Sequence, residues 1–197
     1  KPPRAFRNIT QVLLAVILLC SLWIEKPFVL GLSTPPSEQP SLPAYTLTAW
    51  NAMSYNKGRE RVVRGFTENN PHIACLLEGT YLGAPPDFLQ AAFGDQFQWA
   101  STRQMAIGSR LPIGFAEERN FDSGLRLYRA QVDTAPRPIA ILLVDMPGPP
   151  RLTTRALFRD LRRELDAELL PFILVGDFNT PRASACLRRA TRGLTDF

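Results

Sequence analysis

The sequence has few of the residues that most often carry redox, zinc or triad chemistry. It contains one histidine, His72, and three cysteines among 197 residues. A single histidine excludes every mechanism that needs two, and it disfavours a Ser-His-Asp triad because His72 would be the only base. Three cysteines cannot form a disulfide framework or a four-thiolate zinc site.

A strong charge excess is also absent from most of the chain. The net charge is +5, but residues 1–26 hold four basic residues against one acidic residue, so the remainder is nearly balanced. Few cationic contacts are therefore available to displace counterions from DNA. Hydrophobic residues make up 45% and charged residues 21% of the chain, which excludes wholesale disorder and predicts a buried core.

An apolar segment near the N-terminus predicts a membrane anchor. Residues 9–24 contain only three polar residues, and Trp23 at the end suits a membrane interface. The run is shorter than the roughly 20 residues of a comfortable span, so a cleaved signal peptide and a buried helix remain as alternatives. Three basic residues precede it, which predicts a cytoplasmic N-terminus and export of the rest of the chain.

The chain divides into three regions on composition. Residues 1–32 form the predicted anchor, residues 33–44 a proline-rich linker, and residues 45–197 a folded domain. Prolines at this density keep the linker extended and prevent it from forming a helix. We therefore expect a single-pass protein of the cell membrane with its domain on the periplasmic or extracellular side.

Strand and helix patterns alternate along the domain. Leucines four residues apart, at 157, 161, 165 and 169, predict the buried stripe of one long helix. Several apolar runs are typical of strands that are buried on both faces, which indicates a layered α/β fold. The predicted strands are 45–51, 73–77, 105–109, 124–132, 138–144 and 172–175, and the predicted helices are 60–69, 86–93, 153–169 and 184–190.

Polar side chains stand where apolar strands end. Asn51, Glu78 and Asp145 end three of the predicted strands, and Asp177 with Asn179 follow a fourth. Strand ends of layered α/β proteins meet at one edge, where sites form. Oxygen ligands without histidine or cysteine suit Mg²⁺, which uses one or two carboxylates and a substrate phosphate. The alternative is that each residue only caps a strand or turns the chain.

Four segments occur in an order that resembles a known family. They are residues 47–51 (LTAWN), 70–78 (NPHIACLLE), 106–113 (AIGSRLPI) and 171–180 (PFILVGDFNT). Together they resemble the endonuclease/exonuclease/phosphatase superfamily of Mg²⁺-dependent phosphoesterases, and more closely its bacterial members with a preceding membrane segment. The resemblance implies a four-layer α/β sandwich over residues 45–197, with two β-sheets packed face to face and flanked by helices.

The resemblance also implies a role for each polar residue. Glu78 would bind Mg²⁺ or Mn²⁺, and Asn51 would help to place the metal or the phosphate. Asp177 would activate the attacking water, and Asn179 would hold that water or the scissile phosphate. The implied partner is a phosphate ester, with a nucleic acid or a phospholipid head group among the candidates.

The sequence departs from the family pattern at two places. Asp145 stands where the family usually has a histidine, so we treat it as a candidate catalytic residue of changed character. The terminal Ser-Asp-His segment of the family has no counterpart, so we expect that the C-terminal part of the domain is missing. Two accounts stay open: a metal-dependent nuclease, phosphodiesterase or phosphatase, or a catalytically inactive, membrane-tethered binding domain. His72 lies at the opposite end of its strand from Glu78, and we expect it to be structural.

Overall fold

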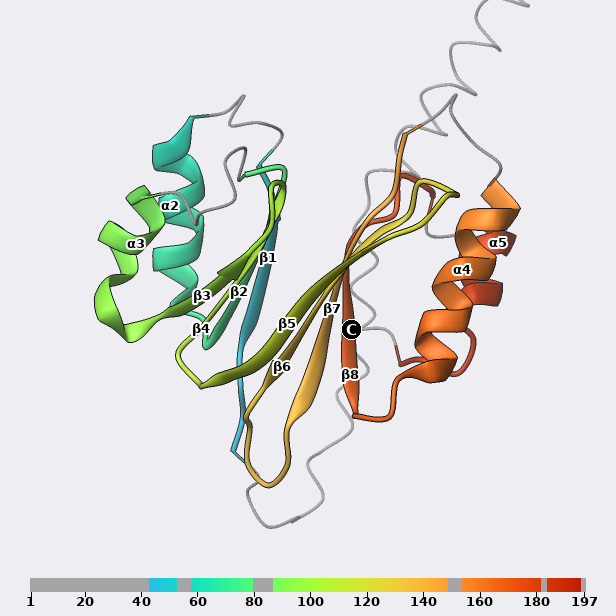
Figure 1. Ribbon diagram of the computed structural model, residues 1–197. Coiled ribbons are helices and arrows are strands. Elements are labelled where there is room, and N and C mark those ends of the chain that lie inside the picture. Colours follow the sequence, from blue (N-terminus) through green and yellow to red (C-terminus); the bar gives the residue numbers. More distant parts are fainter. Residues whose placement is uncertain (1–42, 53–57, 80–86, 149–153, 182–183, 196–197) are drawn as a thin grey trace, which may run out of the picture. The chain divides into compact units, whose positions relative to one another are not determined.

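The fold is described from a computed structural model (Figure 1). The structure describes residues 43–52, 58–79, 87–148, 154–181 and 184–195. The predicted anchor, at residues 1–32, and nearly all of the linker lie outside these ranges. Among the helices that are described, none has the length and apolar character needed to cross a membrane.

The first sheet, sheet A, has four strands in the order β1-β2-β4-β3. They are β1 (Leu47–Asn51), β2 (Ile73–Leu77), β3 (Gln98–Ser101) and β4 (Met105–Ser109). β1 and β2 are parallel, while β4 pairs antiparallel with both β2 and β3. Helix α2 (Arg59–Asn69) connects β1 to β2, and α3 (Asp87–Phe93) with a short 3₁₀ turn follows β2.

The second sheet, sheet B, has four strands in the order β5-β6-β7-β8. They are β5 (Ile113–Asn120), β6 (Arg126–Val132), β7 (Ile139–Asp145) and β8 (Phe172–Asp177). β7 and β8 are parallel and are joined through α4 (Thr154–Ala167), whereas the other neighbours are antiparallel. Helix α5 (Ala185–Ala190) follows β8.

The two sheets share an apolar core, and helices cover their outer faces (Figure 1). On sheet A the outer face packs against Val62 and Phe66 of α2. On sheet B it packs against α4 through leucines 157, 161 and 165. Between the sheets lie Ile73, Cys75, Leu77, Met105 and Ile107 of sheet A and Tyr128, Ala130, Val132, Ile141 and Leu143 of sheet B. The predicted α/β class is confirmed, with two mixed four-stranded sheets.

All six predicted strands and four predicted helices are present, with small shifts at their ends. β3 and β5 were not predicted: β3 is only four residues long, and β5 is an edge strand in which charged side chains interrupt the alternation. The prediction for Leu169 is wrong, because α4 ends at Ala167 and Leu169 is 95% exposed.

Candidate active site

Parallel pairing in each sheet brings the predicted polar residues to corresponding strand ends. In sheet A, Asn51 at the end of β1 lies opposite Leu77, the last residue of β2 before Glu78. In sheet B, Asp145 at the end of β7 lies opposite Asp177 at the end of β8. Each sheet therefore contributes two polar strand ends.

The same side chains continue the rows that face the inner core. Side chains alternate between the two faces of a strand, so residues two apart share a face. Leu47 and Val175 pack against the core between the sheets, which places Asn51 and Asp177 on the same inner faces. Asp145 likewise continues the inward-facing row of β7. The site forms where the apolar filling between the sheets gives way to polar groups.

The amide of Asn51 joins the two sheets at this point. Its Nδ2 donates to Glu78 Oε1 at 3.1 Å and to Asp177 Oδ2 at 2.9 Å. Both oxygens contact one nitrogen, so they lie no farther apart than the sum of these two distances. Three residues that are distant in the sequence thus form one half-buried cluster. The three side chains thus lie together, and their roles stay predictions.

The backbone around the cluster adopts conformations that residues other than glycine rarely take. Glu78 has φ 51° and Asn179 has φ 43°, both in the left-handed region. Such conformations cost free energy for residues with a Cβ and concentrate at functional sites. Gly176 has φ 150°, and a Cβ there would lie 2.0 Å from the carbonyl oxygen of Val144. The glycine before Asp177 is therefore required by the close approach of β7.

The carboxylate of Asp177 is held in one orientation from two sides. Besides the amide of Asn51, the backbone N–H of Asn179 donates to its Oδ1 at 2.8 Å. The side chain of Asn179 donates to the carbonyl of Met146 at 2.6 Å, which ties the loop after β8 to the loop after β7. Asn179 is exposed, and its link to the cluster runs through Asp177.

Asp145 is buried beside the cluster and is paired with Arg126. It is 3% exposed, and Arg126 Nη2 donates to its Oδ2. Burial raises the pKa of Asp145 to about 6; Arg126 opposes this shift, and the nearby carboxylates of Glu78 and Asp177 add to it. Asp145 therefore lies within electrostatic reach of the cluster. Sequence reasoning did not find Arg126, which lies 19 positions earlier on an antiparallel strand.

The cluster suits a Mg²⁺ ion on the chemistry of its donors. Within the described ranges, no three Asp, Glu, His or Cys side chains form a complete ligand set. Mg²⁺ does not need one, since it keeps several waters and binds through one or two carboxylates at about 2.0–2.1 Å. Glu78 and Asp177, bridged by Asn51, provide two carboxylates close enough for one ion to reach directly or through water.

His72 lies at the other end of β2. Its Nδ1 is within hydrogen-bonding distance of Thr46, at 3.1 Å from the backbone nitrogen and 2.9 Å from Oγ1. Its ring meets that of Tyr45 edge-on at 5.6 Å. These contacts are consistent with the structural role expected from the sequence.

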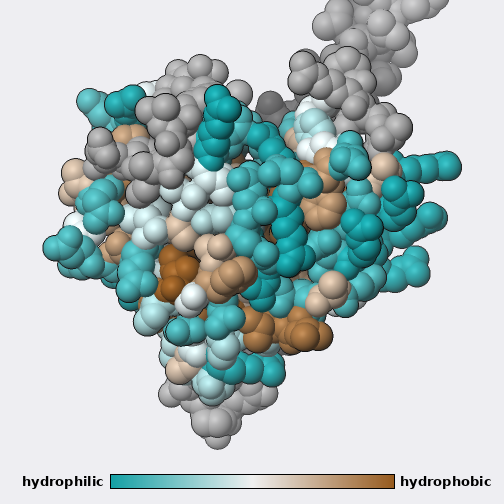
Figure 2. Space-filling view, in the orientation of Figure 1, coloured by the Kyte–Doolittle hydropathy of each residue, from teal (hydrophilic) through white to brown (hydrophobic). Residues whose placement is uncertain are grey.

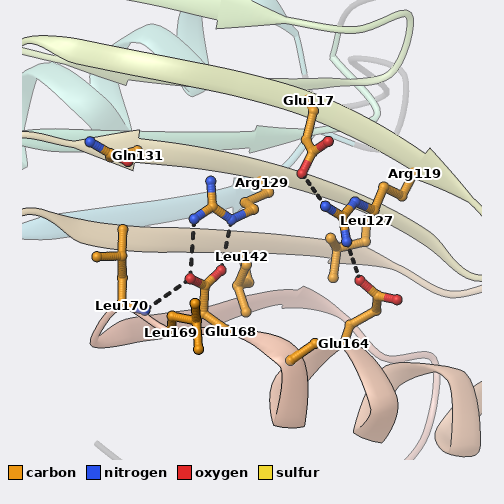
Figure 3. Close-up of a pocket in the computed structure, with 11 residues that line it drawn as sticks. Glu117, Arg119, Leu127, Arg129, Gln131, Leu142, Glu164, Glu168, Leu169 and Leu170 are labelled. Carbon is orange, nitrogen blue, oxygen red and sulfur yellow. Dashed lines mark hydrogen bonds and ion pairs between the residues drawn. The ribbon is translucent and has the colours of Figure 1, made fainter.

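A separate hollow of about 370 Å³ lies on the outer side of sheet B, between the sheet and the end of α4. Figure 3 shows its charged side chains paired with one another. Arg129 binds both carboxylate oxygens of Glu168, and Arg119 pairs with Glu117 and Glu164. We call these five residues, Glu117, Arg119, Arg129, Glu164 and Glu168, the outer network.

The face of the molecule shown in Figure 2 is largely hydrophilic, and hydrophobic residues are confined to limited areas of it.

Comparison with known proteins supports the fold. The catalytic domain of human Nocturnin with bound sulfate anion matches with a TM-score of 0.60 and 14% identity, over 77% of this chain and 69% of that chain. Sphingomyelinase C from Streptomyces griseocarneus matches with 0.58 and 15%, over 76% and 69%. TDP2 from D. rerio, complexed with single strand DNA product, matches with 0.56 and 15%, over 74% and 64%.

At these identities the solved structures show a common fold and nothing finer. No curated protein matches the chain at a significant level. The model of the Endonuclease/Exonuclease/phosphatase family matches residues 48–195, which include every strand end of the cluster. The chain belongs to the endonuclease/exonuclease/phosphatase family, whose members are Mg²⁺-dependent phosphoesterases.

Proposed function

We propose that this domain hydrolyses a phosphate ester with the help of a divalent metal, at the cluster of Asn51, Glu78 and Asp177. The observation that carries the proposal is the bridge of the Asn51 amide between the two carboxylates. Two carboxylates directed at one amide at the end of an apolar core are costly to desolvate unless a cation or a hydrogen bond compensates them. A bound metal would compensate the charge of the two carboxylates, and the Asn51 amide would help to hold the phosphate.

Each residue of the cluster would have a distinct role. Glu78 would hold the metal, and the amide of Asn51 would keep both carboxylates in place and help to position the phosphate. Asp177, fixed by the N–H of Asn179, would orient a water and take its proton. Asn179, exposed beside the cluster, would contact that water or the phosphate. Bound Mg²⁺ would supply positive charge for the phosphoryl oxygens.

The rigidity of these contacts is what favours catalysis. Donors and acceptors that are already aligned need no reorganisation as charge develops on the phosphate. Asp177 is fixed by two N–H groups, and Glu78 is held by the amide of Asn51 together with its own left-handed backbone. A water between Asp177 and the phosphorus atom would therefore meet a preorganised base.

The substrate class within phosphate esters is part of the proposal. The names of the related structures include a sphingomyelinase and a protein bound to a single strand DNA product. The nearly balanced charge of residues 27–197 favours a substrate that needs few cationic contacts. We therefore place a phosphodiester of a lipid head group or a small molecule ahead of long DNA.

The proposal is tested by hydrolysis assays on the full chain with Mg²⁺ and with EDTA. The substrates are bis-p-nitrophenyl phosphate, p-nitrophenyl phosphate, sphingomyelin and single-stranded DNA. We expect turnover that needs Mg²⁺ and that falls about a thousandfold or more in Asp177→Asn, since positioned bases contribute 10²–10⁴-fold. Asp133→Asn is the matched control. Asp133 is exposed and follows the end of β6 that is opposite to Arg126 and the cluster.

Equal background rates for the wild type, Asp177→Asn and the EDTA sample would contradict the proposal. Asp145 at the usual histidine position is the feature that favours the alternative, a catalytically inactive binding domain of the same fold. In that case the chain would still bind a phosphate ester without converting it.

The proposal also assigns the protein a location, which rests on its N-terminal segment. We expect residues 1–32 to tether the domain to the cell membrane, with the domain on the exported side, on the basis of the apolar run and its preceding positive charges. Retention in the membrane pellet after carbonate extraction would support this, and release into the supernatant would contradict it.

A further inference from the structure

Three charged side chains form a row across the end of sheet B. Arg126 on β6 lies opposite Asp145 on β7, which in turn lies opposite Asp177 on β8. Residues directly opposite one another on neighbouring strands share a face. The preceding row of this face, Tyr128, Leu143 and Val175, belongs to the core between the sheets. Arg126 therefore stands on the same face as Asp177, one strand beyond Asp145.

The guanidinium of Arg126 is anchored on one side and open on the other. Asp145, whose side chain is 4% exposed, accepts from Nη2, while the side chain of Arg126 is 34% exposed. Among the described residues, this is the hydrogen-bonding partner of Arg126. The N–H groups on Nη1 and Nε remain for a ligand.

The charge of the site also calls for a cation at this place. Without Arg126, the edge would present the carboxylates of Glu78, Asp145 and Asp177, and both other carboxylates raise the pKa of Asp145. A phosphate ester approaching three carboxylates would be repelled by those that do not hold a metal. A planar guanidinium offers paired N–H donors that match phosphate oxygens.

We propose that Arg126 binds the non-bridging oxygens of the substrate phosphate and that Asp145 positions it for this contact. The inference rests on the proposed phosphoester hydrolysis and names the residue that holds the anion. Asp145 is then a positioning residue and does not transfer a proton. Arg126 would then act as a phosphate ligand from β6, directly opposite Asp145, the position at the end of β7 where the family usually has a histidine.

A purely structural role for Arg126 would be to offset the buried charge of Asp145. The two roles differ when both charges are removed together. The double variant Arg126→Gln/Asp145→Asn leaves no unpaired buried charge, so an offsetting role would be fully replaced. A phosphate contact would still be lost, because glutamine lacks the charge and the paired donors.

The test measures the affinity of inorganic phosphate for the full chain in saturating Mg²⁺, by calorimetric titration, for the wild type and four variants. We expect a loss of about tenfold or more in Arg126→Gln, since the hydrogen bonds from a charged donor to the phosphate would be lost. Arg126→Lys should lose less, and Asp145→Asn should stay within about threefold, since an amide oxygen can still accept from Arg126 and hold it in place. The double variant should bind phosphate about tenfold more weakly than the wild type. Its melting temperature should nevertheless be higher than that of Arg126→Gln, because Asp145 no longer carries an unpaired charge.

Phosphate affinity in the double variant within about threefold of the wild type would overturn the inference, as would unchanged affinity in Arg126→Gln or no phosphate binding by the wild type. Titration of Mg²⁺ alone separates this from the proposed function. If Mg²⁺ binding and Asp177-dependent hydrolysis persist while phosphate affinity ignores Arg126, only the inference fails. If Mg²⁺ binding and hydrolysis are both absent, the proposed function fails.

Discussion

The two faces of sheet B differ in how their acidic side chains are paired with cations. On the inner face, at the ends of β7 and β8, Asp145 and Asp177 gather with Glu78 around Asn51 and Arg126. In the outer network, Glu117, Glu164 and Glu168 are each matched to Arg119 or Arg129 (Figure 3). Within the described part of the chain, the inner region has three carboxylates and one arginine, Arg126, which pairs with Asp145 alone. The outer network has three carboxylates and two arginines, and each carboxylate pairs with an arginine.

The two regions differ in the direction of their pKa shifts. The pKa of Asp145 is raised to about 6, chiefly by burial. The pKa of Glu168 is lowered, chiefly by its hydrogen bond from Arg129. A raised carboxyl pKa means that the folded state disfavours the ionised form, and a lowered pKa means that it favours it. Ionised Asp145 at the inner edge therefore costs stability near neutral pH, whereas ionised Glu168 in the outer network contributes stability.

The largest expected effect is on activity, in Glu78→Gln. Removing the carboxylate should reduce hydrolysis about a thousandfold or more, as in Asp177→Asn, because the metal would lose the carboxylate that holds it and with it several kcal/mol of transition-state stabilisation. Stability should not fall, since the glutamine oxygen can still accept from Asn51. Kinetic assays over a Mg²⁺ series and urea unfolding check this. Glu117→Gln, in the outer network, is the matched control, and a loss of activity there as large as in Glu78→Gln would contradict the comparison.

The next effect is on the pH dependence of stability, in Asp145→Asn. The ordinary pKa of 3.8 rises to about 6 on folding, so the wild type should lose stability as pH rises from 4 to 7. The variant lacks this loss. A rise of about two pKa units at 1.36 kcal/mol per unit should move the difference in unfolding free energy in its favour by about 2.5 kcal/mol. Urea unfolding in EDTA at several pH values measures it. If the difference in unfolding free energy between the variant and the wild type does not change with pH, the pKa of Asp145 is not raised.

The smallest effect is on the stability supplied by the outer network, in Glu168→Gln. We expect a loss of about 1–2 kcal/mol at pH 7, since the paired carboxylate becomes neutral. Because the pKa of Glu168 is lowered from 4.5, the loss should shrink as pH falls below that value, opposite in sign to Asp145. Asp166→Asn, in the exposed pair with Arg162, should change stability by less than about 0.5 kcal/mol. Activity should stay unchanged in both.

The sequence carried enough information to place Asn51, Glu78 and Asp177 at one site. Each follows an apolar run, and parallel strands put such ends at the same edge. The bridge through the Asn51 amide could not be predicted, because it depends on how closely the two sheets approach. The role of Arg126 was hidden for the same reason, since antiparallel pairing with Asp145 depends on the length of the connection between β6 and β7.

Two features of the fold escaped prediction for local reasons. β5 is an edge strand whose charged side chains face solvent or pair with the outer network, so its sequence lacks the apolar alternation of the other strands. Leu169 fits the leucine stripe of α4, but the helix ends two residues earlier and the backbone N–H of Leu170 donates to Glu168. Periodicity alone does not reveal where a helix ends.

The central claim is that Glu78 and Asp177 share one divalent cation. Anomalous diffraction from crystals of the full chain soaked in Mn²⁺ tests it most directly. A single peak should lie within coordination distance of Glu78 and within direct or water-mediated reach of Asp177, and it should vanish in Glu78→Gln. A crystal that binds Mn²⁺ elsewhere, or leaves the space beside Asn51 without a peak at saturating metal, would contradict the account.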